Sequence, residues 1–335
     1  PNPPRNRLLS LALRPAPVTD QWMNEGQGLA GAMPEATADV TMIEAQSSRA
    51  EAGAIALVLR DAAERGKTAA LITPDRVLSR QVTAALDRWG ITPDDSAGRP
   101  LPLTAPGRFL RHVAALVGEK LTSEALLTLL KHPLTNSGSD QRGPHLLHTR
   151  ELELKLRRWG PPFPAAVDLL DWAAKGDESR IAWATWLAGC IAGLEDIGTR
   201  TLTDHLDAHI ALSERLAAGP LGEGSGELWL KEAGGEALRW VEALRQEASH
   251  GGRLTPRDYQ SLFLAVLQRG EVREATGTHA GIMIWGTLEA RVQGADVVVL
   301  GGLNEGVWPE AARPDPWLNR TMRHQAGLLL PERRI

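Results

Sequence analysis

Cysteine is almost absent from this chain of 335 residues. Long apolar runs and lysines are also scarce, and each of these features excludes certain classes of protein. The single Cys190 excludes internal disulfides and any all-cysteine metal site, and it is typical of a reducing, cytoplasmic setting. No apolar run approaches the roughly 20 residues that a membrane-spanning helix needs. Only six lysines occur, so the positive charge is mostly arginine, and the net charge is −4. The chain as a whole is not a polycation, and its charge count is compatible with a local arginine-lined groove that binds phosphates.

Sequence signatures of catalysis are missing as well. A phosphate-cradling loop needs a glycine-rich turn, a lysine for the β- and γ-phosphates and a Ser or Thr for magnesium. No G-x-x-x-x-G-K-[S/T] occurs in the chain, and no nucleophile or acid/base constellation is visible. The composition, 43% hydrophobic and 23% charged, is that of a soluble globular chain large enough for two cores.

Two short apolar runs near the end of the chain, residues 282–285 and 297–300, stand on either side of a polar segment of helical character, residues 287–293. The second run is β-branched and predicts a strand buried on both faces of a parallel sheet. It leads into a glycine-rich loop, residues 301–306. Loops past the carboxyl ends of parallel strands bind ligands. The alternative is a plain tight turn that needs glycine.

An earlier segment predicts the other half of the same α/β domain. We expect strands at residues 39–45 and 68–73, and an amphipathic helix over residues 78–89. Between the two strands, apolar spacing predicts another helix, with Ser47 or Ser48 as its N-cap and Glu51 placed for a capping box.

The middle of the chain reads as almost entirely helical. Apolar residues recur at helical spacing in residues 109–117, 123–130, 181–194, 202–216, 228–244 and 257–267. The segments that separate these helices are rich in glycine and proline, namely residues 133–144, 160–162, 219–226 and 251–252.

These stretches carry a resemblance to a known family. Residues 297–309, a strand followed by GLNEG and Val-Trp-Pro, are similar to motif V of UvrD/RecB-type superfamily 1 helicases. Residues 68–98 resemble motif IV of the same proteins. The run 286–309, followed by 314–317 and 332–334, is most similar to the AddB family in its alphaproteobacterial form, the second subunit of the AddAB helicase–nuclease.

The resemblance implies an α/β fold: a RecA-like parallel-sheet domain of the superfamily 1 2A type, interrupted by a mostly α-helical 2B-like insertion. The expected division is a connecting segment (1–38), the first half of the RecA-like domain (39–105), the helical insertion (106–274) and the second half (275–335), cut off at a motif VI-like end. The chain begins at Pro1 without Met and stops at Ile335, so we expect an excised piece of a larger polypeptide.

The implied function is a part in double-strand break repair by homologous recombination. In the family, this subunit pairs with the AddA motor, and its helicase-like part guides a DNA strand and is implicated in reading a recombination hotspot. The family's complex uses ATP and Mg²⁺ and carries an iron–sulfur cluster in a separate nuclease domain. We expect no cofactor in this chain, and single-stranded or forked DNA and AddA as partners, with no membrane.

By the same resemblance, the groups that face the nucleotide are lost. Pro74 stands where an arginine reaches the γ-phosphate, Leu288 where motif V has a histidine, and Gly294 where it has a glutamate. Proline has no side-chain donor or cation. Arg291, which aligns with a lysine of motif V, keeps its charge. We therefore expect that this chain does not hydrolyse ATP but has kept a contact with DNA.

The candidate DNA-binding residues are polar or aromatic side chains of these loops: Thr287, Arg291, Arg76, Arg80, Trp308 and Asn304. A hydroxyl and guanidinium groups donate to phosphate oxygens, and an indole stacks on an unpaired base. The alternatives are solvated arginines at helix ends and a Trp308 that packs against the following proline.

Other residues are assigned structural roles. His205 and His209 share one helix face but lack a third ligand, so a solvated face is favoured over a zinc site. His145 and His148 meet the same objection. Tryptophans at helical apolar positions are expected in the core: Trp89, Trp159, Trp172, Trp183, Trp186 and Trp240. Asp75 and Asp315 each follow a proline, as in PD-(D/E)xK nucleases, but no acidic-x-Lys follows, so they predict turns.

Two rival functions remain open. The chain could be a DNA-independent scaffold for a partner subunit, or part of an active ATP-dependent helicase whose phosphate loop lies upstream. The scaffold predicts binding that does not change with salt, because no counterions are released. A small-molecule enzyme is a more distant alternative.

Overall fold

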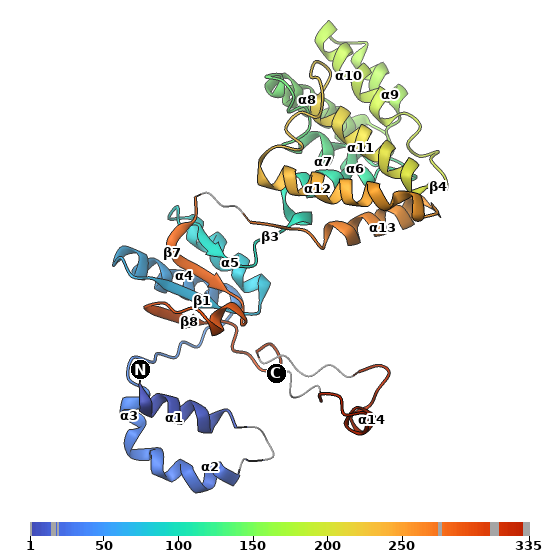
Figure 1. Ribbon diagram of the computed structural model, residues 1–335. Helices are drawn as coiled ribbons and strands as arrows, with labels where there is room; N and C mark the ends of the chain where they lie inside the picture. Colours follow the sequence, from blue (N-terminus) through green and yellow to red (C-terminus); the bar gives the residue numbers. More distant parts are fainter. Residues whose placement is uncertain (1, 15–17, 19, 274–276, 309–314, 331–335) are drawn as a thin grey trace.

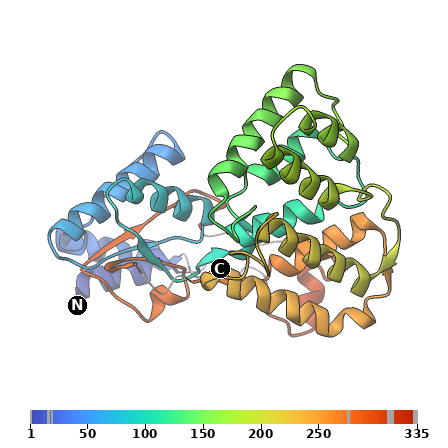
Figure 2. The same ribbon diagram turned by 90° about the horizontal axis from the view of Figure 1, so that it is seen from above.

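The chain is an α/β protein built on a four-stranded, all-parallel central sheet. The computed structural model describes residues 2–14, 18, 20–273, 277–308 and 315–330. Figure 1 shows three parts: a small N-terminal helical unit, the α/β part and a larger helical part. Figure 2 shows the helical part beside the α/β part from a second direction.

The sheet has the order β2-β7-β1-β8. Its strands are β1 (Ala69–Ile72), β2 (Pro93–Asp95), β7 (His279–Trp285) and β8 (Val297–Leu300). β1 lies at its centre, with Leu71 opposite Ile284 on one side and opposite Val299 on the other. Strands from the two ends of the sequence therefore interleave, as the expected split α/β domain requires.

Two helices cover one face of this sheet. α4 (Ser48–Glu64) and α5 (Arg76–Asp87) pack against each other and bury Leu59, Leu71, Val82 and Ile284 completely or almost so. Because side chains alternate along a strand, the residues in register with Leu71 all face these helices. Both helices were predicted, and α4 begins at its predicted N-cap, Ser47, whose hydroxyl accepts a hydrogen bond from Ala50 N–H.

The opposite face of the sheet is only partly covered. Val298 and Leu300 of β8 are 49% and 51% exposed. The prediction of a strand at residues 297–300 is confirmed, but its burial on both faces is wrong, since β8 is an edge strand. Its start is fixed by Asp296, whose carboxylate accepts hydrogen bonds from the backbone and hydroxyl of Thr68, which lowers the pKa of Asp296.

The strand predicted at residues 39–45 is wrong. This segment contains no strand, and Val40, Met42 and Ile43 are 60%, 81% and 60% exposed. A strand needs a hydrogen-bonded neighbour, and here no strand of the described sheet pairs with it. β propensity alone does not supply that partner.

The N-terminal unit is more helical than the single helical patch expected there. It consists of α1 (Pro3–Ala12), α2 (Asp20–Glu25), the 3₁₀ helix η2 (Gly26–Ala32) and α3 (Met33–Ala36). Its small core includes Leu11, Leu29 and Ala36, which are buried. α1 packs against α3.

Helices occupy nearly all of the chain between β2 and β7. They are α6 (Ala105–Ala114), α7 (Ser123–Lys131), α8 (Arg142–Trp159), α9 (Ala166–Ala173), α10 (Glu178–Ile191), α11 (Leu202–Ala218), α12 (Lys231–Glu247) and α13 (Pro256–Leu267). The short strands β4 (Arg200–Thr201) and β5 (Arg253–Leu254) pair within this part. At the joint with the sheet, β3 (Arg99–Pro100) pairs with β6 (Glu271–Val272). The prediction of a helical middle segment is confirmed.

Helices α8 and α9 were not located by apolar spacing. Pro144 was interpreted as part of a segment that separates helices, but it lies in the first turn of α8. The first N–H groups of a helix have no intrahelical partner, so proline costs little there. Along α8 a strongly charged sequence obscures the apolar stripe that Leu152 and Leu156 form.

The prediction that His205 and His209 lie on a solvated face is wrong: they are 3% and 1% exposed. His209 of α11 connects two other helices, because its Nε2 lies 2.9 Å from the Leu110 carbonyl and its Nδ1 lies 2.6 Å from the Tyr259 hydroxyl. A carbonyl only accepts, so Nε2 carries the proton and Nδ1 accepts from Tyr259. His205 Nε2 lies 2.9 Å from the Leu254 carbonyl.

His145 of α8 is held in the same way, so the solvated position favoured for it is also wrong. Its Nε2 lies 2.8 Å from the Leu130 carbonyl, and Trp183 Nε1 donates to its Nδ1 at 3.0 Å. His148 is buried as well and contacts Ser179. These imidazoles serve as buried polar links between helices.

No helix in the described part of the chain is both long and apolar enough to cross a membrane.

Candidate nucleic-acid interface at the carboxyl edge of the sheet

The candidate residues come from loops that leave one edge of the sheet. Because all strands of the sheet are parallel, their carboxyl ends lie at the same edge. The loop after β1 leads to Arg76, the loop after β7 carries Thr287 and Arg291, and the loop after β8 carries Asn304 and Trp308. Since β1 lies between β7 and β8, these three loops are neighbours.

The loop after β1 is a tight, capped turn. Asp75 is the N-cap of α5, and its carboxylate accepts hydrogen bonds from Val77 N–H at 2.7 Å and Leu78 N–H at 3.2 Å. Thr73 Oγ1 accepts from Asp75 N–H at 3.1 Å. The turn predicted for Asp75 is confirmed. Pro74 is exposed in this turn.

Arg76 and Arg80 lie on the first turns of α5 and are exposed. Arg76 Nη1 is 3.3 Å from Asp95 Oδ1, and Arg80 Nε donates to the Arg76 carbonyl at 3.1 Å. Asp95 also accepts from Ser79 Oγ at 3.0 Å, which ties the end of β2 to α5. An exposed ion pair of this kind is weak, about 0–1 kcal/mol, so Arg76 can be released to bind a phosphate.

The glycine loop after β8 is held by a contact that the sequence did not indicate. Glu51 was placed in a capping box, but its Oε1 instead accepts a hydrogen bond from Gly302 N–H at 2.7 Å. Gly302 has φ +77°, which favours glycine. A Cβ on Gly301 would lie 2.8 Å from Leu71 Cδ1, so this glycine permits close packing on the core. The loop is therefore an anchored feature of the edge, and glycine is needed for both conformation and space.

The loop after β7 carries an exposed cation, Arg291. Residues 287–293 contain the one-turn 3₁₀ helix η5 (Glu289–Arg291), in agreement with their predicted helical character. Thr287 and Arg291 are exposed, and neither side chain has a hydrogen bond or ion pair with the described residues. Leu288, 70% exposed, projects from the same turn.

The loop after β8 turns back on itself beyond the glycines. The Asn304 carbonyl accepts from Val307 N–H at 3.0 Å and from Trp308 N–H at 3.1 Å, and the Asn304 side chain is exposed. Trp308 is partly buried. Pro309, the expected partner of Trp308, and the motif VI-like residues 331–335 lie outside the described residues. Asp315 forms the predicted turn by accepting from Trp317 and Leu318 N–H.

The described residues of this edge offer several hydrogen-bond donors. Guanidinium groups and a hydroxyl bind phosphate oxygens. Of the carboxylates at this edge, Asp75, Asp95 and Glu51 accept hydrogen bonds from the chain, and Glu289 and Glu305 lie in the loops after β7 and β8. Within the described residues, no three His, Cys, Asp or Glu side chains are grouped so that they could hold a metal ion. The arrangement is suited to holding an anion.

Comparison with known proteins gives no family assignment: no protein-family profile matches the chain, and neither does any curated protein sequence.

Proposed function

We propose that this chain is the helicase-like module of an AddB-type subunit, which binds and guides a DNA strand in the repair of double-strand breaks. In this proposal the parallel sheet is a RecA-like domain of the 2A type, and the helices from α6 to α13 are its 2B-like insertion. The sheet is compatible with that fold, and the helices lie between its strands in the chain.

The proposal rests on the side-chain hydrogen-bond donors that several loops bring to the carboxyl edge of the sheet. Arg76, Thr287 and Arg291 reach this edge from two adjacent strands, and Arg291 has no partner within the described chain. Three donors spread along an edge fit a polyanion better than one small ligand, because each contacts a separate phosphate.

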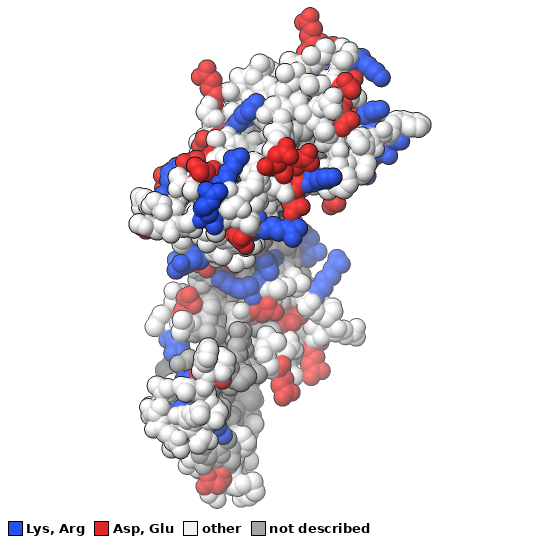
Figure 3. All heavy atoms as spheres, turned by 90° about the vertical axis from the view of Figure 1, so that its right-hand side faces the viewer, with Lys and Arg blue, Asp and Glu red and all other residues white. Residues whose placement is uncertain are grey.

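The charge distribution supports the same proposal. Figure 3 shows a band of Lys and Arg side chains at the level where the helical part joins the α/β part. The two chain segments that form this joint carry Arg99, Arg269 and Arg273, all exposed. The chain as a whole is negatively charged, so a nucleic acid would bind along the local basic band and not over the whole surface.

The module itself does not hydrolyse ATP in this proposal. The loops that would face a nucleotide present Pro74, Leu288 and Gly294, which offer no cation, base or carboxylate. Hydrogen bonds to the Asp75 and Glu51 carboxylates hold the loops at the sheet edge in place. The edge can therefore contact DNA even though the ATP site is lost.

A contact with a partner such as the AddA motor is favoured by a second observation. Apolar side chains are exposed around β8 and its neighbouring loops: Leu288 70%, Val292 85%, Val298 49%, Leu300 51% and Leu303 60%. Exposed apolar groups gathered in one region mark a surface for protein contact. The scaffold function is therefore an additional role of this region, compatible with DNA binding at the edge.

Arg291→Ala is expected to weaken binding of single-stranded DNA about two- to fivefold at low salt, the loss of one exposed charge contact. Fluorescence anisotropy of a labelled oligonucleotide measures this. The matched control is Arg65→Ala. Arg65 is exposed at the end of α4, pairs only with Asp61 among the described residues, and lies near the opposite edge of the sheet. Equal affinities for Arg291→Ala, Arg65→Ala and the parent would remove Arg291 from the interface.

A further inference from the structure

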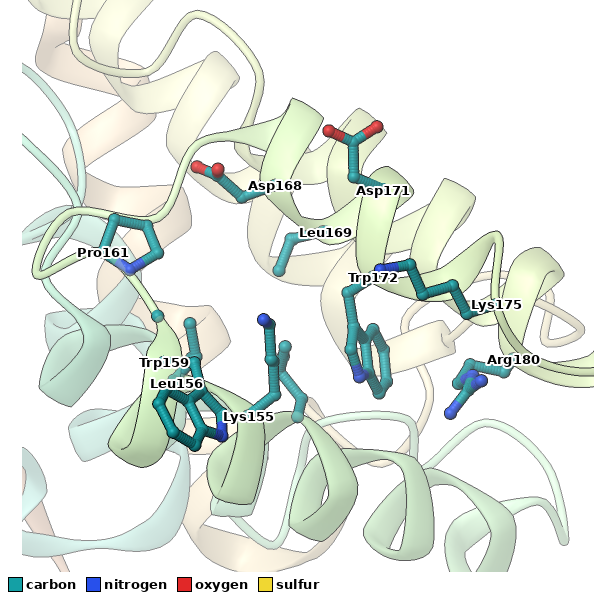
Figure 4. Close-up of a pocket in the computed structure, with 12 residues that line it drawn as sticks. Lys155, Leu156, Trp159, Pro161, Asp168, Leu169, Asp171, Trp172, Lys175 and Arg180 are labelled. Carbon is teal, nitrogen blue, oxygen red and sulfur yellow. The ribbon is translucent and has the colours of Figure 1, made fainter.

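A cavity of about 360 Å³ opens between α8 and α9 in the helical part (Figure 4). Its volume lies within the range of small-ligand sites, about 300–1,000 Å³. The cavity lies in the helical part, away from the carboxyl edge of the sheet, and no sequence pattern indicated it.

Two indoles line this cavity. Trp159 was expected in the core, but it is 79% exposed, because α8 ends there and the following turn leads the chain away. Trp172 of α9 is partly buried: its ring meets Trp183 edge-on, with centroids 6.2 Å apart, and the Arg180 guanidinium lies 4.9 Å from its centroid. Figure 4 shows both indoles at the gap between the helices. A ligand that covers an exposed indole gains the free energy of removing its apolar surface from water.

Cations surround the same gap. In Figure 4 the Lys155 side chain rises from α8 between Trp159 and Trp172. Lys155 has no hydrogen bond or ion pair with the described residues. Lys175 and Arg180 also line the cavity, and Arg180 Nε is buried without a hydrogen-bond partner. The Arg180 head group is 3.6 Å from Glu151, a loose pair.

Two carboxylates, Asp168 and Asp171, also line the cavity, so its three cations exceed its anions by one. Asp168 accepts a hydrogen bond from Ala165 N–H at 2.8 Å and thereby caps α9. Figure 4 shows the Asp171 carboxylate on the side of α9 that faces away from α8. An aromatic cage for a cationic ligand needs an electron-rich centre free of other cations. Lys155 at the centre excludes that use and favours a ligand that is aromatic and anionic.

We propose that the α8–α9 cavity binds a nucleobase with its attached phosphate. The base stacks on Trp159 and approaches Trp172, and Lys155 binds the phosphate, with Lys175 at the rim. Stacking on an aromatic side chain contributes about 1–3 kcal/mol per base and accepts any base. The ligand is either an unpaired base of a single strand or a free nucleotide. The site shares no residue with the sheet edge, so it stands independently of the function proposed for that edge.

The test uses 2-aminopurine, whose fluorescence is quenched by stacking. The two probes are 2-aminopurine deoxynucleoside monophosphate and a single-stranded oligonucleotide with one 2-aminopurine. We expect quenching with at least one probe. Trp159→Ala should weaken that binding about fivefold or more, the lower end of a lost stacking contact. Lys155→Ala should weaken it and reduce its salt dependence, since a phosphate contact is lost.

Arg150→Ala is the matched control, because Arg150 is exposed on α8 but does not line the cavity. It should bind as the parent does. Trp159 and Lys155 are exposed, so their replacement should leave the circular dichroism spectrum unchanged. Quenching of the oligonucleotide alone identifies a strand as the ligand, and quenching of the monophosphate identifies a nucleotide site. No quenching with either probe, or equal binding by Trp159→Ala and parent, overturns the proposal. Arg291→Ala should leave quenching of the monophosphate unchanged, which separates this site from the sheet edge.

Discussion

Gly234→Ala is expected to destabilise the helical part by about 3 kcal/mol, while Gly235→Ala stabilises it by about 0.5–1 kcal/mol. Both glycines lie in α12. A Cβ on Gly234 would lie 2.4 Å from the carbonyl carbon of Trp229 and 2.8 Å from the Leu228 oxygen, so the backbone itself must shift. A Cβ on Gly235 would meet nothing within 4 Å, and alanine is the better helix former.

Urea unfolding followed by circular dichroism measures both variants. The two substitutions are chemically identical and adjacent, so differences of helix propensity cancel in the comparison. A stability change of the same sign and size in both variants would contradict the packing of α12 against the turn that precedes it.

Acidification from pH 6.5 towards pH 4 is expected to destabilise the helical part strongly. Burial is the main cause that lowers the pKa of His132, His145 and His209 from 6.5 to about 4. Each folded-state pKa lies below its unfolded value, so the unfolded chain binds more protons between these limits. Stability is then fully present above pH 6.5 and lost as pH falls towards 4. For His209, the pKa difference between the unfolded and folded states corresponds to roughly 3 kcal/mol of folding stability.

The geometry gives the physical reason. Nδ1 of His145 accepts from Trp183, a side chain that can only donate, so a protonated His145 would set two N–H groups against each other. The thermal midpoint at pH 7.5, 6, 5 and 4.5 measures the effect. Carboxylates with lowered pKa, such as Glu153 and Glu236, lose their contribution to stability mainly below their unfolded value of 4.5, the lower end of this window. His145→Gln keeps one donor and one acceptor but does not titrate, so its midpoint should fall less. A midpoint independent of pH across this window would contradict neutral buried histidines.

The sequence predicted most of the regular elements and part of the candidate site. Apolar spacing located α4 and α5, and the β-branched run located β8, because these patterns follow directly from burial of one face. The rule that ligands bind in loops past the carboxyl ends of parallel strands indicated this edge of the sheet, and the pairing of β1 with β7 makes the loops that lead to Arg76 and Arg291 neighbours.

Contacts between distant residues could not be predicted. His209 meets Leu110 and Tyr259, which are 99 and 50 residues away in the chain, whereas the sequence favoured a solvated helix face. Glu51 meets Gly302, 251 residues away, although its local spacing fits a capping box. In each case a tertiary partner overrode the local pattern. A single sequence contains no signal for such a partner.

The salt dependence of single-stranded DNA binding tests the central claim most directly. Fluorescence anisotropy of a labelled oligonucleotide is measured with the chain over a salt series. If phosphates bind Arg76, Thr287 and Arg291 at the sheet edge, log affinity should fall linearly with log salt. Each neutralised phosphate contributes about −0.7 to the slope, so two arginine contacts predict about −1.4 or steeper. No binding at low salt, or binding that does not change with salt, would contradict a DNA-guiding function and leave the scaffold role.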